Sequence, residues 1–335
     1  MEPTIKDVAR RANVSTATVS RVLNGGHWVA EETRAAVLSA VQELNYKPNA
    51  VARSLMSAQT KTLAILFPKV SDMFSGTVLG GVEDAAQGRG FSVIVGRTGG
   101  DHERTLGYLQ LLAEKRVDGL IFASEVLRGE YAEFIGRLRL PLVVLSGESA
   151  RPGTPTIRCD DRQAAYAATS YLIGQGHERI GMLYGGPHET PEQSGRLSGF
   201  HEAHRDHGLV VEPERVLCLG GFAFRDGQTG GAALLGQARD LTAVFASSDE
   251  LALGVMSAAF KRGLRVPDDL SVMGFDDLPL AEMSLPPLTT VRQPLYGMGR
   301  RAATMLLDHI QGVKPLEGHA IFPTTIVERQ SVRRV

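Results

Sequence analysis

The chain opens with two short amphipathic patterns that lie close together. In the first, apolar residues recur with the i, i+3, i+4, i+7 spacing of one helix face, at Ile5, Val8, Ala9 and Ala12. Asn13 tolerates a turn, and Ser15 follows at the position of a helix N-cap. The buried face of a second helix is marked by Val19, Val22 and Leu23. The pattern therefore predicts two helices joined by a tight turn, a helix-turn-helix.

The outward face of the second helix suits DNA. The helical spacing leaves the side chains opposite the apolar stripe facing out, namely Thr16, Ala17, Ser20 and Arg21. Small side chains let a helix approach base edges in the major groove, and an arginine donates two hydrogen bonds to guanine. This face is therefore the candidate for reading a DNA sequence.

A third helix is predicted from Glu31 to about Asn45, with an inner stripe formed by Val37, Ala40, Val41 and Leu44. Trp28 precedes this helix. DNA contact is one interpretation of Trp28, but we expect it to pack within the small helical core. Pro48 ends the third helix, and Asn49 is placed to cap a helix over residues 50–56. That helix is too short to be stable alone in water.

From Leu63 onward, apolar runs alternate with amphipathic helical stretches. The runs that we predict as strands are Leu63–Phe67, Ser92–Val95, Gly119–Ala123, Leu142–Leu145, Ile180–Tyr184, Val216–Leu219, Ala243–Ala246 and Ser271–Gly274. The helical stretches between them include 75–88, 103–115, 162–174, 194–207, 228–236 and 250–262. This alternation predicts parallel sheets covered by helices on both faces. Because there are too many strands for one comfortable sheet, we expect two doubly wound lobes.

Composition agrees with a globular protein of several domains. The 335 residues suit two or three domains, and the apolar and charged fractions of 43% and 22% are ordinary. No apolar run is long enough to span a bilayer and no apolar signal core is present, so we expect the protein in the cytoplasm. Cys159 and Cys218 form no CxxC pair and predict no disulfide framework.

Charge is distributed unevenly along the chain. Residues 1–61 carry eight basic and five acidic residues, a net charge of +3, whereas the remainder carries a net charge of −4. This distribution is consistent with a basic module that binds DNA phosphates and an acidic module that binds a different ligand. The asymmetry is modest, so useful DNA affinity would require two copies.

The N-terminal segment resembles the lactose/galactose repressor (LacI/GalR) family of bacterial transcription regulators. The resemblance is carried by Asp7-Val8-Ala9, Val14-Ser15, Thr18-Val19-Ser20-Arg21-Val22, Asn24, Leu44-Asn45-Tyr46, Pro48-Asn49, Ala52 and Ser54-Leu55. Within that family, the purine repressor branch is the most similar over Thr4–Val14, Val29–Arg34 and Ala50–Leu55.

The resemblance implies an architecture. A helix-turn-helix headpiece would occupy residues 1–48, a hinge helix and linker 49–61, and an effector-binding and dimerisation core 62–335. The core would have the fold of a type I periplasmic binding protein, with two lobes that divide the chain at about 62–161 plus 293–320 and at about 162–292 plus 321–335. No heptad tail follows, so we expect a homodimer rather than a larger assembly.

The resemblance also assigns roles in binding double-stranded DNA, at a palindromic operator. Bases would be read by Thr16, Ala17 and Arg21, and phosphates would be held by Ser15, Thr18 and Asn24. In the hinge, Asn49 would cap the short helix and Leu55 would unstack a base step from the minor groove.

For the core, the resemblance implies an effector between the lobes. The residues that match effector-contacting positions of the family are Phe74, Asp160, Arg196, Phe222, Ser248, Asp249 and Asp276. Most of these follow predicted strands, where ligands of doubly wound folds bind. Helix capping is an alternative role for Asp160 and Asp249, whereas Arg196 and Asp276 are harder to explain structurally.

The chemistry of these residues favours a sugar or a sugar derivative. Carboxylates accept hydrogen bonds from hydroxyls, an arginine donates two in one plane, and aromatic faces cover the C–H side of a sugar ring. Thr190 and Glu192 stand where the purine repressor branch has an arginine and a threonine, and the loop 187–194 contains no arginine. A purine or nucleoside effector and a protein partner remain alternatives. For a sugar, we favour induction.

Other classes of protein fit less well. No GxGxxG motif follows the first strand, and neither a Walker loop nor a nucleophile elbow occurs, so we expect neither an enzyme nor a cofactor. His201, His204 and His207 could chelate a stray metal ion, but we expect a solvated helix face and no metal site. The headpiece and the lack of a signal segment oppose a solute-binding protein for transport.

Overall fold

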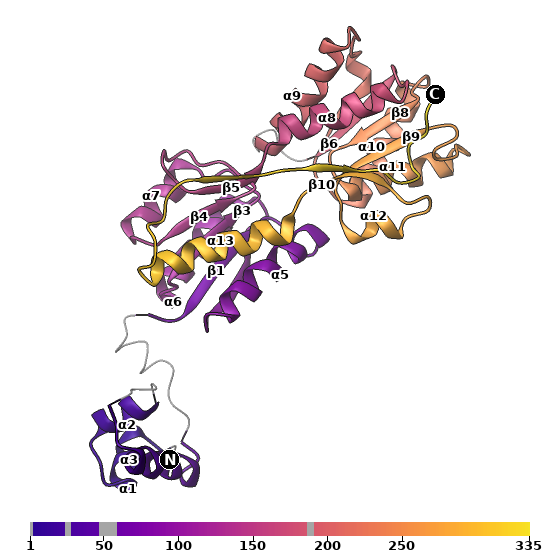
Figure 1. Cartoon of the computed structure of the whole chain (residues 1–335). Coiled ribbons are helices and arrows are strands. Elements are labelled where there is room, and N and C mark those ends of the chain that lie inside the picture. The colour runs from indigo at the N-terminus through magenta and orange to yellow at the C-terminus, as the bar shows by residue number, and fades with distance from the viewer. Residues whose placement is uncertain (1–2, 24–27, 47–58, 186–190) are drawn as a thin grey trace. The chain divides into compact units, whose positions relative to one another are not determined.

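The structure is a computed structural model that describes residues 3–23, 28–46 and 59–185, together with 191–335 (Figure 1). The chain divides into two compact units, residues 1–60 and 61–335, and each is described by itself. Within the described residues, no helix combines the length and the apolar character needed to cross a membrane.

The first unit contains the predicted helix-turn-helix, formed by α1 (Ile5–Arg11) and α2 (Thr16–Leu23), followed by α3 (Glu31–Glu43). Asn13 adopts a left-handed conformation with φ of 53° in the turn. The backbone N–H of Thr18 donates to Oγ of Ser15 at 3.1 Å, which confirms Ser15 as the cap of α2. A small core forms around the fully buried side chains of Val8, Val19 and Val37.

The prediction that Trp28 packs in this core is wrong, because 96% of its surface is exposed. The next residue, Val29, packs against the core instead. A core of small aliphatic side chains has room for a valine at this point, and the indole remains in solvent.

The second unit contains two six-stranded sheets. The first has the order β11-β5-β4-β3-β1-β2 and the second the order β12-β10-β9-β8-β6-β7. The strands are β1 (Thr62–Phe67), β2 (Ser92–Arg97), β3 (Gly119–Ala123), β4 (Leu142–Leu145), β5 (Thr156–Cys159), β6 (Ile180–Gly185), β7 (Val216–Leu219), β8 (Ala243–Ala246), β9 (Ser271–Asp276), β10 (Thr289–Arg292), β11 (His319–Phe322) and β12 (Thr325–Val327). Within the described residues, neighbouring strands pair in parallel except for β10 with β12, which are antiparallel. The two doubly wound lobes are thus confirmed.

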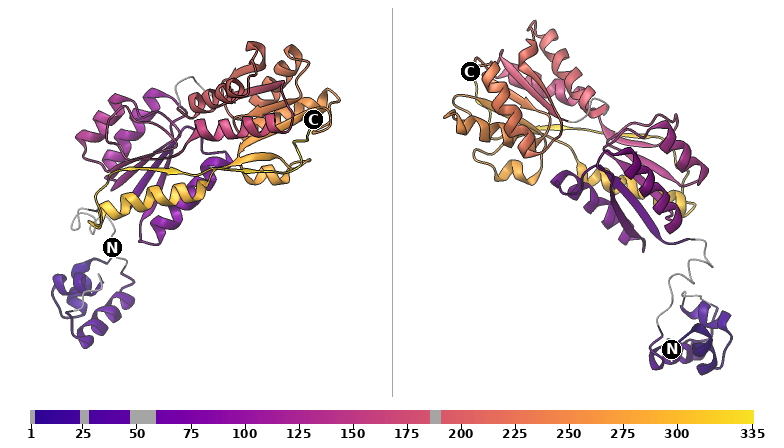
Figure 2. Two further views of the ribbon diagram at one scale, coloured as in Figure 1. Left: turned by 45° about the horizontal axis from the view of Figure 1, so that its top comes forward. Right: turned by 180° about the vertical axis from the view of Figure 1, so that it is seen from behind.

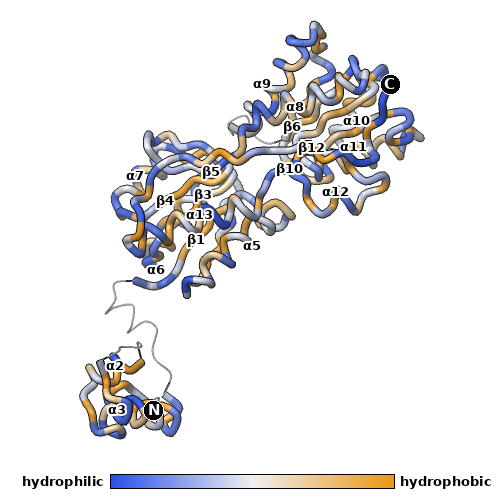
Figure 3. The backbone as a smooth tube through the Cα atoms, viewed as in Figure 1, coloured by the Kyte–Doolittle hydropathy of each residue, from blue (hydrophilic) through white to orange (hydrophobic). Residues whose placement is uncertain are grey.

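Helices cover both sheets. They are α5 (Met73–Gln87), α6 (His102–Lys115), α7 (Gly129–Arg137), α8 (Asp161–Gly174), α9 (Pro191–Asp206), α10 (Phe224–Gln237), α11 (Asp249–Lys261), α12 (Pro279–Met283) and α13 (Leu295–Ile310), with a 3₁₀ turn at Pro213–Arg215. Figure 3 shows apolar strands beneath helices whose outer turns are polar. The central strands are buried almost throughout, as expected for parallel sheets covered on both faces.

The chain passes between the two sheets at three points. The first follows β5 at Asp160, the second follows β10 at Gln293 and Pro294, and the third lies between β11 and β12. The yellow segment that carries β11 and β12 can be followed from one sheet to the other in Figures 1 and 2. Residues beside these crossings therefore lie where the lobes meet.

On α9, the predicted solvated histidine face is only partly correct. His201 and His207 are exposed, but His204 is buried, with Nδ1 at 2.9 Å from the Phe200 carbonyl and its ring 4.3 Å from the Phe200 ring. Burial lowers the pKa of His204, which keeps it neutral in this packing. Among the described residues, no group of His, Cys, Asp and Glu has the geometry of a metal site.

Three helix pairs pack with their backbones in close approach at glycines. A Cβ atom at Gly81 or Gly299 would strike the backbone of the facing helix in the α5–α13 pair. The same holds for Gly199 between α8 and α9, and for Gly227 and Gly254 between α10 and α11. These contacts fix the distances between helices that flank the carboxyl ends of the strands.

Gly254→Ala should destabilise the second unit by about 1–3 kcal/mol, because the new Cβ would lie 2.5 Å from the Phe224 carbonyl oxygen. Chemical or thermal unfolding of the whole chain measures the effect. The matched control is Gly107→Ala in α6, where a Cβ meets open space and should be neutral or stabilising by up to about 1 kcal/mol. Equal stability of the two variants would contradict the close-packing argument.

Candidate functional site

Helix α2 presents an exposed face in the first unit. Thr16, Ala17 and Arg21 are exposed, whereas Val19 and Val22 on the opposite face are buried. The Ser15 and Thr18 hydroxyls lie 2.9 Å apart at the helix start. The residues predicted to read bases therefore share one accessible surface. Three other predicted DNA contacts, at Asn24, Asn49 and Leu55, lie outside the described residues, as does most of the predicted hinge.

In the second unit, two of the predicted effector residues begin helices. The Asp160 carboxylate accepts a hydrogen bond from the Gln163 backbone at 3.0 Å and caps α8. The Ser248 hydroxyl accepts one from the Leu251 backbone at 3.1 Å and caps α11. Both lie at carboxyl ends of strands, so capping leaves them beside the edge where a ligand would sit.

The two predicted aromatic residues lie on different lobes. Phe74 is the second residue of α5 and packs, half-buried, against the core of the first sheet. Phe222 follows β7 and packs, half-buried, against the core of the second sheet, and its carbonyl accepts from the Ser248 hydroxyl at 3.4 Å. Each ring thus keeps part of its surface accessible near a strand end.

Arg196 has a structural role that the sequence did not indicate. Its Nε donates to Asp161 Oδ1 at 2.8 Å, and its Nη1 donates to the Ser247 carbonyl at 2.5 Å. The guanidinium also lies 3.9 Å from the centre of the Phe275 ring. Burial raises the pKa of Asp161, and the Arg196 charge opposes that rise. Arg196 therefore joins α8, α9, β8 and β9 at the edge of the second sheet.

Asp276 ends β9 in an unusual backbone conformation, with φ of 118°. Its carboxylate is nearly buried and accepts from Gln293 Nε2 at 2.8 Å. Burial raises the pKa of Asp276 to about 7, against the stabilising charge of Arg196. Since Gln293 lies on the second crossing between the lobes, this bond ties the sheet edge to the crossing.

Asp249 neither caps α11 nor faces solvent. It is fully buried, and Ser248 is the cap. Its Oδ2 accepts from the Leu278 backbone at 2.7 Å and its Oδ1 accepts from the Thr290 hydroxyl at 2.5 Å. Burial raises the pKa of Asp249 well above its ordinary value. Both oxygens are used to hold the loop after β9 against β10, so Asp249 supports the site rather than lining it.

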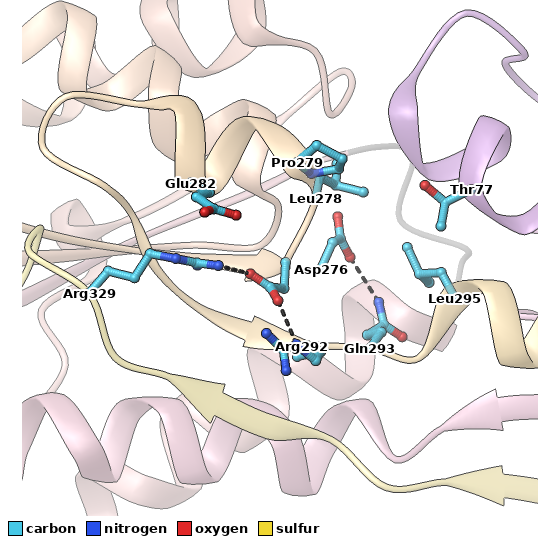
Figure 4. Close-up of a pocket in the computed structure, with 10 residues that line it drawn as sticks. Thr77, Asp276, Leu278, Pro279, Glu282, Arg292, Gln293, Leu295 and Arg329 are labelled. Atoms are coloured by element: carbon cyan, nitrogen blue, oxygen red, sulfur yellow. Dashed lines mark hydrogen bonds and ion pairs between the residues drawn. The ribbon is translucent and has the colours of Figure 1, made fainter.

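A pocket of about 360 Å³ lies beside Asp276 (Figure 4). The first lobe contributes Thr77 and Leu295, and the second contributes the segment from Asp276 to Pro279. The Asp277 carboxylate forms part of its wall, paired with Arg292 at 2.6 Å and Arg329 at 2.7 Å. The pocket is thus lined from both lobes at the second crossing.

Three serines at strand ends are not among the site residues predicted from the sequence. Ser124, Ser146 and Ser247 are the first residues after β3, β4 and β8. Among the described residues, their hydroxyls are buried and have no hydrogen-bond partner. Leaving a buried hydroxyl unpaired is unfavourable, so each such group at the ligand edge of a doubly wound fold is a candidate for a hydrogen bond to a ligand. Their position directly after apolar runs was the available signal.

The carboxyl ends of the two sheets face each other. Lys69, just after β1, forms an ion pair of 3.6 Å with Glu250 in the first turn of α11, just after β8. Polar side chains at the two edges can therefore contact one ligand.

Comparison with known proteins identifies the class. Residues 4–49 match the model of bacterial regulatory proteins of the lacI family, and residues 169–332 match that of a periplasmic binding protein-like domain. The repressor CytR of Escherichia coli strain K12 is 36% identical over 331 residues, which cover 98% of this chain and 96% of that protein. The repressor PurR of Klebsiella pneumoniae strain 342 is 38% identical over 335 residues, with the same coverages.

Solved structures of transcription regulators resemble this fold over nearly the whole chain. A lac repressor dimer bound to operator and the anti-inducer ONPF superimposes with a TM-score of 0.89 at 28% identity, covering 99% of this chain and 100% of that one. A complex of the transcriptional regulator CelR with cellobiose has a TM-score of 0.74 at 33% identity, covering 98% and 99%.

The protein is thus a helix-turn-helix regulator with a periplasmic binding protein-like core. It belongs to the lacI family of bacterial regulatory proteins and is a DNA-binding transcriptional repressor. Its relatives are transcriptional repressors rather than enzymes, in agreement with the sequence.

Asp276→Asn should change how stability depends on pH. The raised pKa means that the folded state holds the proton more tightly than the unfolded state, so this contribution is full below about pH 4 and is lost as the pH rises through about 7. The melting temperature of the wild type should therefore fall relative to the variant between about pH 5 and about pH 8.

The control for this measurement is Asp269→Asn. Hydrogen bonds from Arg265 lower the pKa of Asp269 to about 2, so its contribution is constant over the same range. If the melting temperatures of the wild type and Asp276→Asn changed in parallel with pH, the raised pKa of Asp276 would be contradicted.

Proposed function

We propose that the protein binds a palindromic operator as a homodimer and that a sugar-like effector in the core weakens this binding. The observation that supports an effector most directly is a set of buried hydroxyls at facing sheet edges, those of Ser124, Ser146 and Ser247, which have no hydrogen-bond partner within the described part of the chain. A ligand rich in hydroxyl groups satisfies such a surface, because hydroxyls both donate and accept.

The headpiece, residues 1–48, would read DNA with the exposed face of α2. Thr16 and Ala17 would contact thymine methyl groups, and Arg21 would donate to guanine. Ser15, Thr18 and Asn24 would hold phosphates. In the linker, 49–61, Asn49 would cap the hinge helix and Leu55 would enter the minor groove.

Dimerisation is supported by the low positive charge of the DNA-binding segment and by the similarity to a dimeric repressor structure. Residues 1–61, with a net charge of +3, neutralise few phosphates, so two joined copies would multiply the affinity. The similar lac repressor structure is a dimer on its operator. Met283, the last residue of α12, and Leu285 just after it are 73% and 91% exposed, and a second copy would cover such apolar side chains.

The effector would lie between the carboxyl edges of the two sheets, within the core 62–335. Asp160, Ser248 and Asp276 would accept or donate hydrogen bonds, and Phe74 and Phe222 would pack on its apolar face. Arg196 would act on the ligand while it holds Asp161, and Asp249 would support the site from beneath. The cellobiose complex of the CelR regulator supports a sugar.

The crossings between the lobes would couple effector binding to DNA binding. Asp276 is bonded to Gln293, so a ligand that competes for this carboxylate changes the packing of the second crossing. A ligand that favours one lobe arrangement shifts the population towards it, and DNA binding changes by the same coupling free energy.

Arg21→Ala should weaken operator binding by roughly tenfold or more, because a bidentate contact to guanine carries about 1–3 kcal/mol. An operator selected from random DNA, followed by fluorescence anisotropy, provides the measurement. Ligand binding to the core should be unchanged. The control is Arg139→Ala, which removes the same charge from an exposed position of the core. Equal operator affinity of the Arg21 variant and the wild type would remove Arg21 from the interface.

Ser247→Ala should weaken effector binding without lowering the stability of the folded protein. Because the buried Ser247 hydroxyl has no hydrogen-bond partner among the residues that the structure describes, its removal should leave the melting temperature of the free protein unchanged or higher. Effector affinity should fall several-fold, since the ligand loses one hydrogen bond. The matched control is Ser170→Ala on α8, which removes another buried hydroxyl that has no partner in the described ranges. A lower melting temperature with normal effector response would show that Ser247 is structural.

A further inference from the structure

Lys69 and Glu250 form an ion pair that joins the two lobes away from the chain crossings. The Lys69 ammonium lies 3.6 Å from Oε2 of Glu250. Lys69 is the second residue after β1 in the first lobe, and Glu250 stands in the first turn of α11 in the second lobe. Unlike an ion pair within one lobe, this inter-lobe ion pair therefore depends on how the lobes are placed relative to each other.

Both ends of the inter-lobe ion pair are attached to well-held backbone. The carbonyls of Phe67 and Pro68, directly before Lys69, accept hydrogen bonds from the backbone after β2 at 2.8 and 3.0 Å. Glu250 follows Ser248, which caps α11, and α11 packs closely on α10. Because neither backbone segment can shift freely, a change in the ion pair acts on the lobes as whole bodies.

Solvent reaches the inter-lobe ion pair in part. The exposed fraction is 41% for the Lys69 side chain and 19% for the Glu250 side chain. Salt screens the attraction between partly exposed charges, with a Debye length of about 10 Å at 0.1 M and about 3 Å at 1 M. The attraction between the lobes at this point therefore falls as the ionic strength rises.

We propose that the inter-lobe ion pair makes the arrangement of the lobes, and with it operator binding, depend on ionic strength. At low salt the pair holds the two lobes together, and at high salt its loss lets them move apart about the crossings. The packed lobes move as units, so the crossings take up the change. This regulation needs no effector. Only its last step, from lobe arrangement to operator binding, rests on the proposed function.

The distance between the lobes tests the proposal on the purified whole chain without added ligand. Spin labels are attached through Glu133→Cys on α7 and Ala233→Cys on α10, both exposed positions, in a Cys218→Ser background. Burial raises the pKa of Cys159 to about 12, so this thiol does not react. The labelled chain is diluted into excess unlabelled chain, and pulsed electron paramagnetic resonance then measures distances within one copy.

Raising the salt concentration from about 0.1 M to about 1 M should lengthen the distance between the labels. The ratio of separated to close lobes should rise by up to roughly fivefold, as for partly exposed ion pairs in general. Lys69→Gln should give the longer distances already at low salt and should show no further response. This variant is cleaner than Glu250→Gln, because a carboxylate in the first turn of α11 also stabilises that helix.

Two further variants separate the inter-lobe ion pair from a general effect of charge. Combining Lys69→Gln with Glu250→Gln should give the same distances as Lys69→Gln alone, because both changes remove one interaction. The matched control is Glu202→Gln, which breaks the pair of Arg162 with Glu202 at 2.6 Å between α8 and α9, within the second lobe. This control should keep the distances and the salt response of the wild type.

Operator binding is then compared between the wild type and Lys69→Gln over the same range of salt. Release of counterions from DNA phosphates weakens both proteins equally, because their DNA-binding segments are identical. The two affinities should therefore differ at low salt, by up to roughly fivefold, and should converge at high salt.

The possible results distinguish the inter-lobe ion pair from the function proposed above. Inter-lobe distances that respond neither to salt nor to Lys69→Gln would overturn the proposal, whether or not an effector is known. A response of equal size in Glu202→Gln would overturn it as well. Distances that respond, combined with equal operator affinities at every salt concentration, would contradict the coupling between lobes and DNA, and regulation by ionic strength would fail with that coupling.

Discussion

The buried ion pair between Arg196 and Asp161 organises the second lobe. Asp161 is the first residue of α8, immediately after the first crossing, and Arg196 comes from α9. Removing either partner would leave a charge buried without compensation, which typically costs several kcal/mol. Because Arg196 also bonds the Ser247 carbonyl and stacks on Phe275, the pair fixes the crossing against the ends of β8 and β9.

Close helix packing has a consequence for where the molecule can bend. The glycine contacts of α5 with α13 and of α10 with α11 leave little free space within each lobe. Packed interiors respond to force as units, so a change at the sheet edges is absorbed by the segments that join the two lobes. These segments are the crossings at Asp160, at Gln293–Pro294 and between β11 and β12.

The fold was largely readable because buried parallel strands are continuous apolar runs. Gly119–Ala123, Leu142–Leu145 and Ala243–Ala246 were predicted with their observed bounds. Four strands, β5, β10, β11 and β12, were not predicted. Of these, β11 and β12 are half-exposed edge strands of four and three residues, which is too short for a clear hydrophobic pattern. Both follow a crossing, and their place in a sheet depends on contacts with distant segments.

The site was less predictable, because the same residue type performs different tasks at neighbouring positions. Ser248 and Asp249 are both capping residues by type, yet Ser248 caps α11 and Asp249 is buried beneath it. Nor does local pattern tell which hydroxyl has no hydrogen-bond partner among the residues described. Ser247 differs from Ser248 only in what the folded chain brings near it.

The backbone at the end of β9 connects these observations to regulation. Asp276 and Asp277 have φ of 118° and 58°, conformations that side chains with a Cβ rarely adopt. Such strain persists only where surrounding bonds hold it, and here Gln293 holds Asp276 while Arg292 and Arg329 hold Asp277. Two of these three partners lie at the second crossing. A ligand that takes over the Asp276 carboxylate therefore removes one restraint on a strained segment and alters the crossing directly, without needing to deform either packed lobe.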